Sequence, residues 1–160
     1  MPRVFKAGTL KAFFIAAILV LATTLGMIPI TQARSEITLK LVKTITIDKL
    51  GIYDISWSPD GELLAVGTSI SDEAGSHGWV YVFDKNGNQV WVSADLGGWI
   101  HDVSWSSDGW YLAVGIENSN TGDGRVYILD RSGLVLRSIN LSSEVVSVSW
   151  SPDGMYIVVG

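Results

Sequence analysis

The stretch Ile52–Gly67 (IYDISWSPDGELLAVG) recurs without gaps at Ile100–Gly115 (IHDVSWSSDGWYLAVG) and at Val145–Gly160 (VVSVSWSPDGMYIVVG). The copies begin 48 and 45 residues apart. Between them a second pair aligns, Val80–Trp91 (VYVFDKNGNQVW) with Val126–Arg137 (VYILDRSGLVLR). A repeat of this period predicts an architecture built from similar units that stack on one another.

Each unit predicts four short antiparallel strands. In the first strand of the last copy, alternation places Val146, Val148 and Trp150 on one face and serines on the other. Ser-Pro-Asp-Gly at 58–61 and 151–154 predicts a tight turn, because proline presets φ and aspartate accepts a local backbone hydrogen bond. A short apolar run, a third strand and an outer fourth strand follow. Four such strands at a ~45-residue period are typical of a β-propeller blade.

The repeated stretch resembles the blades of WD-repeat and WD-like propellers, whose pattern is V-x-S-V-x-W-S-P-D-G-x-x-L-A-x-G, over roughly residues 40–160. The resemblance implies an all-β fold of four-stranded antiparallel propeller blades. The motifs are degenerate: the Trp-Asp pair of the family is Phe83-Asp84 in one copy and Leu129-Asp130 in the next. The Gly-His pair is absent, so the family's buried Asp-His-Ser/Thr-Trp network is not expected. Val80–Trp91 is also similar to a quinoprotein-type blade, in which the terminal tryptophan docks between blades.

The pattern divides residues 34–160 into a partial propeller. We expect an outer strand at 39–47, blades at 52–93 and 100–141, and a half-blade at 145–160. A closed ring needs about four to eight blades, so the expectation is an incomplete ring, a fragment of a larger propeller. Three tryptophans occupy equivalent first-strand positions and are predicted to be buried: Trp57, Trp105 and Trp150.

Residues 1–33 have the character of a signal peptide or signal anchor. A basic start with Arg3, Lys6 and Lys11 precedes the apolar run Ala12–Ile30, and small residues surround Ala33. The run nearly reaches the ~20 residues that span a bilayer, so an uncleaved anchor helix is the alternative. Either way the domain is expected to be extracytoplasmic: secreted, periplasmic or anchored to the outer face of the cytoplasmic membrane. Membrane contact is expected only through residues 12–30, if they remain uncleaved.

Composition argues against several functions. After residue 33 the chain has eight Lys or Arg and sixteen Asp or Glu, and this negative charge repels nucleic acid. The absence of cysteine excludes disulfides and thiolate chemistry. Two histidines without a ligand pattern predict no metal site, and no motif predicts catalysis or a cofactor. Asn118–Gly124 (NSNTGDG) is read as a hairpin tip, with a calcium loop as the lesser alternative.

Chain geometry predicts a binding face. In a four-stranded meander, the loop between the second and third strands and the connection between blades emerge at the same end. That end collects the longest and most polar loops, and loops on a rigid scaffold usually carry binding. The candidate residues are Asp72, Glu73, His77, Trp79, Trp99, His101, Glu117, Asn118, Asn120 and Asp123.

These features favour a non-enzymatic extracytoplasmic module for protein interaction or scaffolding. Its expected partner is another protein or further propeller blades. One alternative is the propeller domain of an exported enzyme, of the peptidase or quinoprotein type, with its catalytic part beyond residue 160. The other is a propeller that binds a glycan or peptide through Trp99 and His101.

Residues 1–35, fused to a reporter, are expected to carry it across the cytoplasmic membrane, because a basic start and an apolar run direct export. Mass spectrometry of the product should find a mature terminus near Arg34. A full-length product retained in the membrane would establish the anchor instead.

Overall fold

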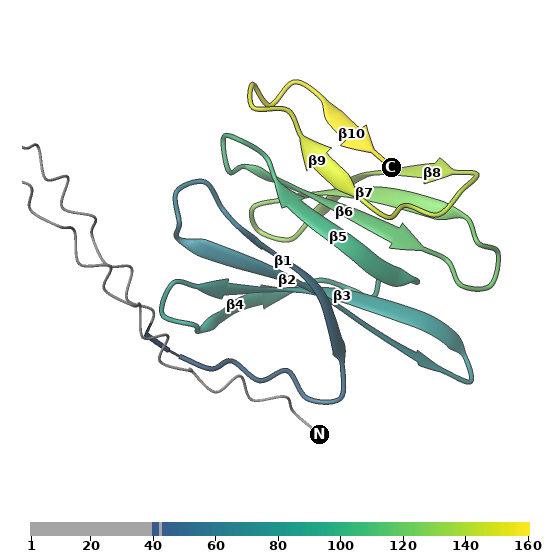
Figure 1. Cartoon of the computed structure of the whole chain (residues 1–160), viewed down its shortest axis with the longest axis horizontal. Helices are drawn as coiled ribbons and strands as arrows, with labels where there is room; N and C mark the ends of the chain where they lie inside the picture. Colours follow the sequence, from purple (N-terminus) through teal and green to yellow (C-terminus); the bar gives the residue numbers. More distant parts are fainter. Residues whose placement is uncertain (1–39, 42) are drawn as a thin grey trace, which may run out of the picture. The chain divides into compact units, whose positions relative to one another are not determined.

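The computed structural model describes residues 40–41 and 43–160, and the signal or anchor helix expected within residues 1–33 lies outside them. The described part is all-β, and none of its residues belongs to a helix long and apolar enough to cross a membrane. Its elements, drawn in Figure 1, are β1 (Gly51–Trp57), β2 (Leu63–Asp72), β3 (Gly75–Asp84), β4 (Gln89–Val92), β5 (Trp99–Trp105), β6 (Tyr111–Glu117), β7 (Gly124–Asp130), β8 (Val135–Leu141), β9 (Val148–Trp150) and β10 (Ile157–Val159).

The strands form two four-stranded antiparallel sheets and a two-stranded pair. The first sheet has the order β1-β2-β3-β4, the second β5-β6-β7-β8, and β9 pairs with β10. Each four-stranded sheet is a meander of consecutive strands, as in a propeller blade. Together they make an open, incomplete ring, so the predicted fold class is confirmed.

The tight turn between the first two strands has the same construction in all three copies. The Gly61 N–H donates to the Ser58 carbonyl at 2.8 Å, and the Ser58 hydroxyl donates to Asp60 at 2.6 Å. Gly61 has a φ of 70°, a backbone conformation that is strained for residues with a side chain. The same hydroxyl-to-carboxylate bond recurs from Ser106 to Asp108 and from Ser151 to Asp153. The turns predicted from Ser-Pro-Asp-Gly and Ser-Ser-Asp-Gly are therefore present.

The main core lies between the first and second sheets. Val80 and Val82 of β3 pack in one buried cluster with Ile100, Trp105 and other residues of the second sheet. A smaller cluster joins the second sheet to the β9–β10 pair. Most of the burial therefore lies at the faces where one sheet meets the next.

Two contacts recur at these interfaces. A Cβ added at Gly67 would lie 2.7 Å from the Ile100 side chain, and one at Gly115 would lie 2.6 Å from the Val145 side chain. Each glycine thus admits an aliphatic side chain from the next unit. The second recurring contact is polar. The Asp54 carboxylate accepts a hydrogen bond from the Val103 N–H at 2.9 Å, and Asp102 accepts one from the Val148 N–H at 2.8 Å.

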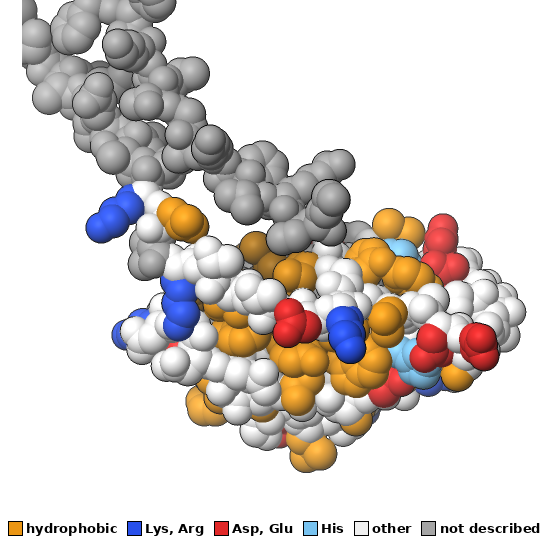
Figure 2. All heavy atoms as spheres, turned by 90° about the horizontal axis from the view of Figure 1, so that it is seen from below, with side chains coloured by type: hydrophobic (Ala, Val, Ile, Leu, Met, Phe, Trp, Pro, Cys, Tyr) orange, Lys and Arg blue, Asp and Glu red, His pale blue; other side chains and the backbone are white. Residues whose placement is uncertain are grey.

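The three equivalent tryptophans are not equally buried, so the prediction of burial for all three is wrong. Trp105 is 6% exposed, Trp57 is 53% exposed, and Trp150 is half-buried. In the described part of the chain, no sheet packs on the face of the first sheet that carries Ile55 and Trp57. Figure 2, which views the molecule from below Figure 1, shows hydrophobic side chains gathered on the face toward the viewer. Burial here depends on a neighbouring sheet rather than on the repeat motif.

Two further expectations have different outcomes. An outer strand was expected at 39–47, but residues 43–47 do not form a strand. No strand of the described residues pairs with them. The expectation that Trp91 docks between blades agrees with the structure. Its indole N–H donates to the Arg131 carbonyl, in the turn between β7 and β8, at 3.0 Å, and its ring packs against the main core.

Replacing Trp105 by alanine should lower the free energy of unfolding by about 3–5 kcal/mol, because a large buried aromatic side chain is removed. Trp57→Ala is the matched control and should cost less than about 1 kcal/mol, since its side chain is half in solvent. Chemical denaturation measures both. Equal losses, or a loss below about 1 kcal/mol for Trp105→Ala, would contradict the packing described here.

Candidate functional site

The longer loops and blade connections lie at one end of the sheets, on the right in Figure 1. They are the turn after β2, the connection from β4 to β5, the loop from β6 to β7 and the connection from β8 to β9. The tight turns lie at the opposite end. We call the first group the loop end, and define it by residues 69–79, 95–101, 117–125 and 142–144.

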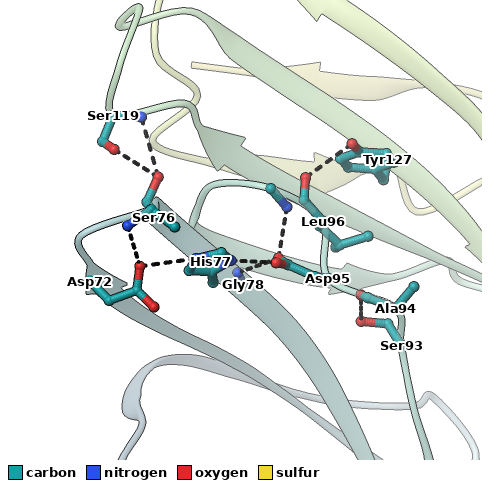
Figure 3. Close-up of polar contacts among 12 residues, drawn as sticks. Asp72, Ser76, His77, Gly78, Ser93, Ala94, Asp95, Leu96, Ser119 and Tyr127 are labelled. Atoms are coloured by element: carbon teal, nitrogen blue, oxygen red, sulfur yellow. Dashed lines mark hydrogen bonds and ion pairs between the residues drawn. The ribbon is translucent and has the colours of Figure 1, made fainter.

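His77 is the centre of a polar network at the loop end (Figure 3). Its Nδ1 lies 2.5 Å from an Asp95 carboxylate oxygen, and its Nε2 lies 3.4 Å from Asp72. Asp95 also accepts hydrogen bonds from the N–H groups of Gly78 and Gly97. The network therefore fixes the β2–β3 hairpin to the connection that leads into the second sheet.

A second link reaches the β6–β7 loop. The hydroxyl of Ser119 donates to the hydroxyl of Ser76 at 2.8 Å (Figure 3). Ser76 is buried, and it precedes His77 on β3. Three segments far apart in sequence are thus held together by hydrogen bonds among small polar side chains and one histidine.

The network shifts the acidity of its members. The pKa of His77 is raised, first because its ring hydrogen-bonds to Asp95 and then because the charges of Asp95 and Asp72 favour the protonated ring. Burial pushes the pKa of Asp95 upward, but hydrogen bonds from His77, Gly97 and Gly78 outweigh it, so this pKa is lowered. The Ala74 N–H, and then the charge of His77, lower the pKa of Asp72. The three groups favour a charged state in which two carboxylates surround an imidazolium.

The aromatic candidates take up defined positions. The ring of Trp79 stacks on His77 with centroids 5.9 Å apart, and Trp99 meets Tyr53 edge-on at 5.1 Å. Both tryptophans are half-buried, so packing holds their rings while part of each remains accessible. His101 lies where the β5–β6 register is interrupted, and its Nε2 is 3.1 Å from Glu117.

The remaining candidates lie on the tips of the loops. Glu73 is exposed in the β2–β3 turn. Asn118 accepts a hydrogen bond from the Asn120 N–H at 3.0 Å, and this bond shapes the β6–β7 loop as a turn. Among residues 40–41 and 43–160, no group of three or more His, Cys, Asp or Glu side chains is arranged to hold a metal ion.

A hollow of about 480 Å³ lies beside this loop, and the predicted residues Asn118 and Asp123 line it. Arg125, Asn140 and Ser142 also line it. The sequence placed Arg125 and Ser142 in the loops of this end without singling them out as candidates, and it missed Asn140. Asp95, the partner of His77, was likewise placed at this end but not singled out as a candidate. Arg125 was detectable as the only Lys or Arg in the four segments of the loop end, but its place beside a hollow depends on the packing of β7 and β8.

Repeated four-stranded meanders docked face to face define this chain as a β-propeller protein. Residues 73–153 match the family model described as "Anaphase-promoting complex subunit 4 WD40 domain", and residues 39–84 match the one described as "WD domain, G-beta repeat". The first match spans more than half of the 160 residues, so the chain belongs to the WD40 family. No curated protein matches the sequence.

Solved structures show the same fold. One is titled "Crystal structure of the eukaryotic initiation factor" and is 14% identical with a TM-score of 0.56, covering 73% of this chain and 28% of that one. The other is the β-propeller domain of the Trilobed protease from Pyrococcus furiosus, reported to have an open velcro topology. It is 16% identical with a TM-score of 0.50, covering 71% of this chain and 35% of that one. The chain thus spans about a third of the length of these structures, and the likeness concerns the fold only.

The raised pKa of His77 predicts a pH dependence of stability. A folded-state pKa above the ordinary value of 6.5 means that the network contributes fully below about pH 6.5 and loses its contribution as pH rises through the folded pKa. The difference in unfolding free energy between wild type and His77→Gln should therefore shrink as the pH rises above about 6.5. Denaturation at a series of pH values measures this difference. An NMR titration that gives His77 a pKa of 6.5 or lower would contradict the network.

Proposed function

We propose that this chain is an extracytoplasmic protein-interaction module that catalyses no reaction and binds another protein through its loop end. WD40 domains in general mediate protein–protein interaction, and the family is shown by two matches. A fold does not by itself fix a function, so the proposal depends on the loop end.

The observation that carries the proposal is the linkage of three loops into one ordered surface. His77 joins the β2–β3 hairpin to Asp95, and Ser76 joins the same hairpin to Ser119. Loops held in place before binding lose less conformational entropy when a partner docks, so less of the interaction energy is lost to ordering. The opposite end offers only tight turns.

The charge of the loop end indicates the chemistry of the partner. Its segments contain Asp72, Glu73, Asp95, Glu117, Asp123 and Glu144, against Arg125 as the one Lys or Arg and His77, whose protonated ring is already paired with Asp95 and Asp72. A surface of this sign favours a partner with a basic segment, both in the approach and in the docked complex. Half-buried Trp79 and Trp99 add apolar area of the kind that dominates interface energies.

The extracytoplasmic location is supported by the sequence of residues 1–33, whose basic start and apolar run are typical of export. The lack of cysteine means that the exported domain does not depend on disulfide formation for its stability.

A photo-crosslinking residue placed at Glu73 in the full chain, expressed in its own cells, should yield a discrete adduct with another protein. The same residue placed at Glu62, which is exposed beside a tight turn at the opposite end, is the matched control and should yield none. Mass spectrometry identifies the adducts. An adduct at position 62 that equals or exceeds the one at position 73, or no adduct at position 73, would contradict the proposal.

A further inference from the structure

We infer that the hollow beside Arg125 receives the carboxylate of a basic peptide segment. This inference deepens the proposed function and rests on it, since Asn118 and Asp123 of the loop end also line the hollow. It names the group that the loop end recognises, which neither the fold nor the family specifies.

Arg125 is held in place by uncharged groups. Its Nε donates to the Asn140 side-chain oxygen at 2.6 Å, and its Nη1 donates to the Tyr127 hydroxyl at 2.8 Å. The guanidinium carbon lies 5.6 Å from the centre of the Tyr127 ring. Tyr127 in turn donates to the Leu96 carbonyl at 3.1 Å, as Figure 3 shows. These contacts hold the guanidinium in one orientation. Because none of the partners carries a charge, they do not neutralise it.

The charge is not neutralised within the described part of the chain. Each ion pair found there uses another cation, so no described carboxylate lies within 4 Å of Arg125. Of the five N–H groups of an arginine side chain, the two hydrogen bonds leave three to donate. A fixed guanidinium with free donors suits a planar carboxylate, which it can bind through two parallel hydrogen bonds.

The walls of the hollow supply further polar groups. Thr121 and Ser142 bring hydroxyls, and Asn118 and Asn140 bring amides that can donate to the same ligand. The hollow measures about 480 Å³, which admits a terminal residue of a peptide. Gly97 and Gly124 form part of the lining, so the backbone there is not screened by side chains.

The surroundings select among anions. Asp123 also lines the hollow, and the rest of the loop end is acidic. A doubly charged phosphate meets more repulsion there than a singly charged carboxylate does. A carboxylate flanked by Lys or Arg fits best, because the flanking cations interact with the acidic rim while the carboxylate reaches Arg125.

Three fluorescent Lys-rich octapeptides, matched except for the groups named next, test the inference on the purified full chain. The first has a free C-terminal carboxylate, the second has a C-terminal amide, and the third has the amide and one internal glutamate. Fluorescence anisotropy gives the dissociation constants. The first or the third should bind at least about tenfold more tightly than the second, the scale of a charge-assisted bidentate contact. Whichever binds tightly identifies a chain end or a glutamate side chain as the source of the carboxylate.

Variants assign the effect to Arg125. Arg125→Gln should reduce the preference for a carboxylate to about onefold, and Arg125→Lys, which keeps the charge but loses the planar fork, should retain only part of it. Arg137→Gln, at an exposed position of β8, removes the same charge elsewhere and should keep the full preference. The Lys variant also keeps the test valid if the Gln variant fails to fold.

Equal affinities for the three peptides, an absence of binding at millimolar concentration, or equal effects of Arg125→Gln and Arg137→Gln would overturn the inference. Inorganic phosphate that displaces the first peptide better than acetate does would overturn the assignment of a carboxylate. These failures leave the proposed function standing if the adduct at position 73 forms, whereas the loss of that adduct removes the proposed function itself.

Discussion

The fold depends on how each sheet docks on the next. Gly67 and Gly115 leave room for an aliphatic side chain of the following unit, and a Cβ at either position would collide with it. Beside each glycine, a first-strand aspartate accepts a hydrogen bond from a backbone N–H of the next first strand. Burial raises the pKa of Asp54, which is therefore a partly desolvated acceptor within an interface. Apolar packing and this polar contact together set the spacing of the sheets.

The geometry of the loop end depends on how the two sheets dock. Asp95 belongs to the connection between the two sheets, and it reaches His77 only because the second sheet is held against the first. Arg125 is oriented by Tyr127, whose hydroxyl contacts a carbonyl of the same connection. The interface between the sheets thus positions both the polar network and the guanidinium, and a change in docking would alter both.

The sequence predicts the local structure well and the neighbourhoods of side chains less well. Strand alternation and the Ser-x-Asp-Gly turns are encoded within a few residues, so the meanders and turns follow from them. The exposure of Trp57 could not be predicted, because its motif equals that of Trp105 and only the adjoining sheet differs. The candidate residues of the loop end were predicted from topology. The pairing of His77 with Asp95 and the hollow beside Arg125 required the packed structure, since neither partner is near in sequence or marked by a motif.

The aspartates of the tight turns have a consequence for the behaviour of the molecule in acid. A serine hydroxyl, then the Glu62 N–H and then Arg131 lower the pKa of Asp60 to about 2. Similar hydroxyl and N–H donors lower the pKa of Asp108, Asp130 and Asp153 at the same end. These carboxylates stay ionised at a pH where ordinary acidic groups have begun to lose their charge. Molecules that approach one another by this end therefore continue to repel at a pH near the ordinary aspartate pKa of 3.8, and the end opposite the loop end favours colloidal solubility there.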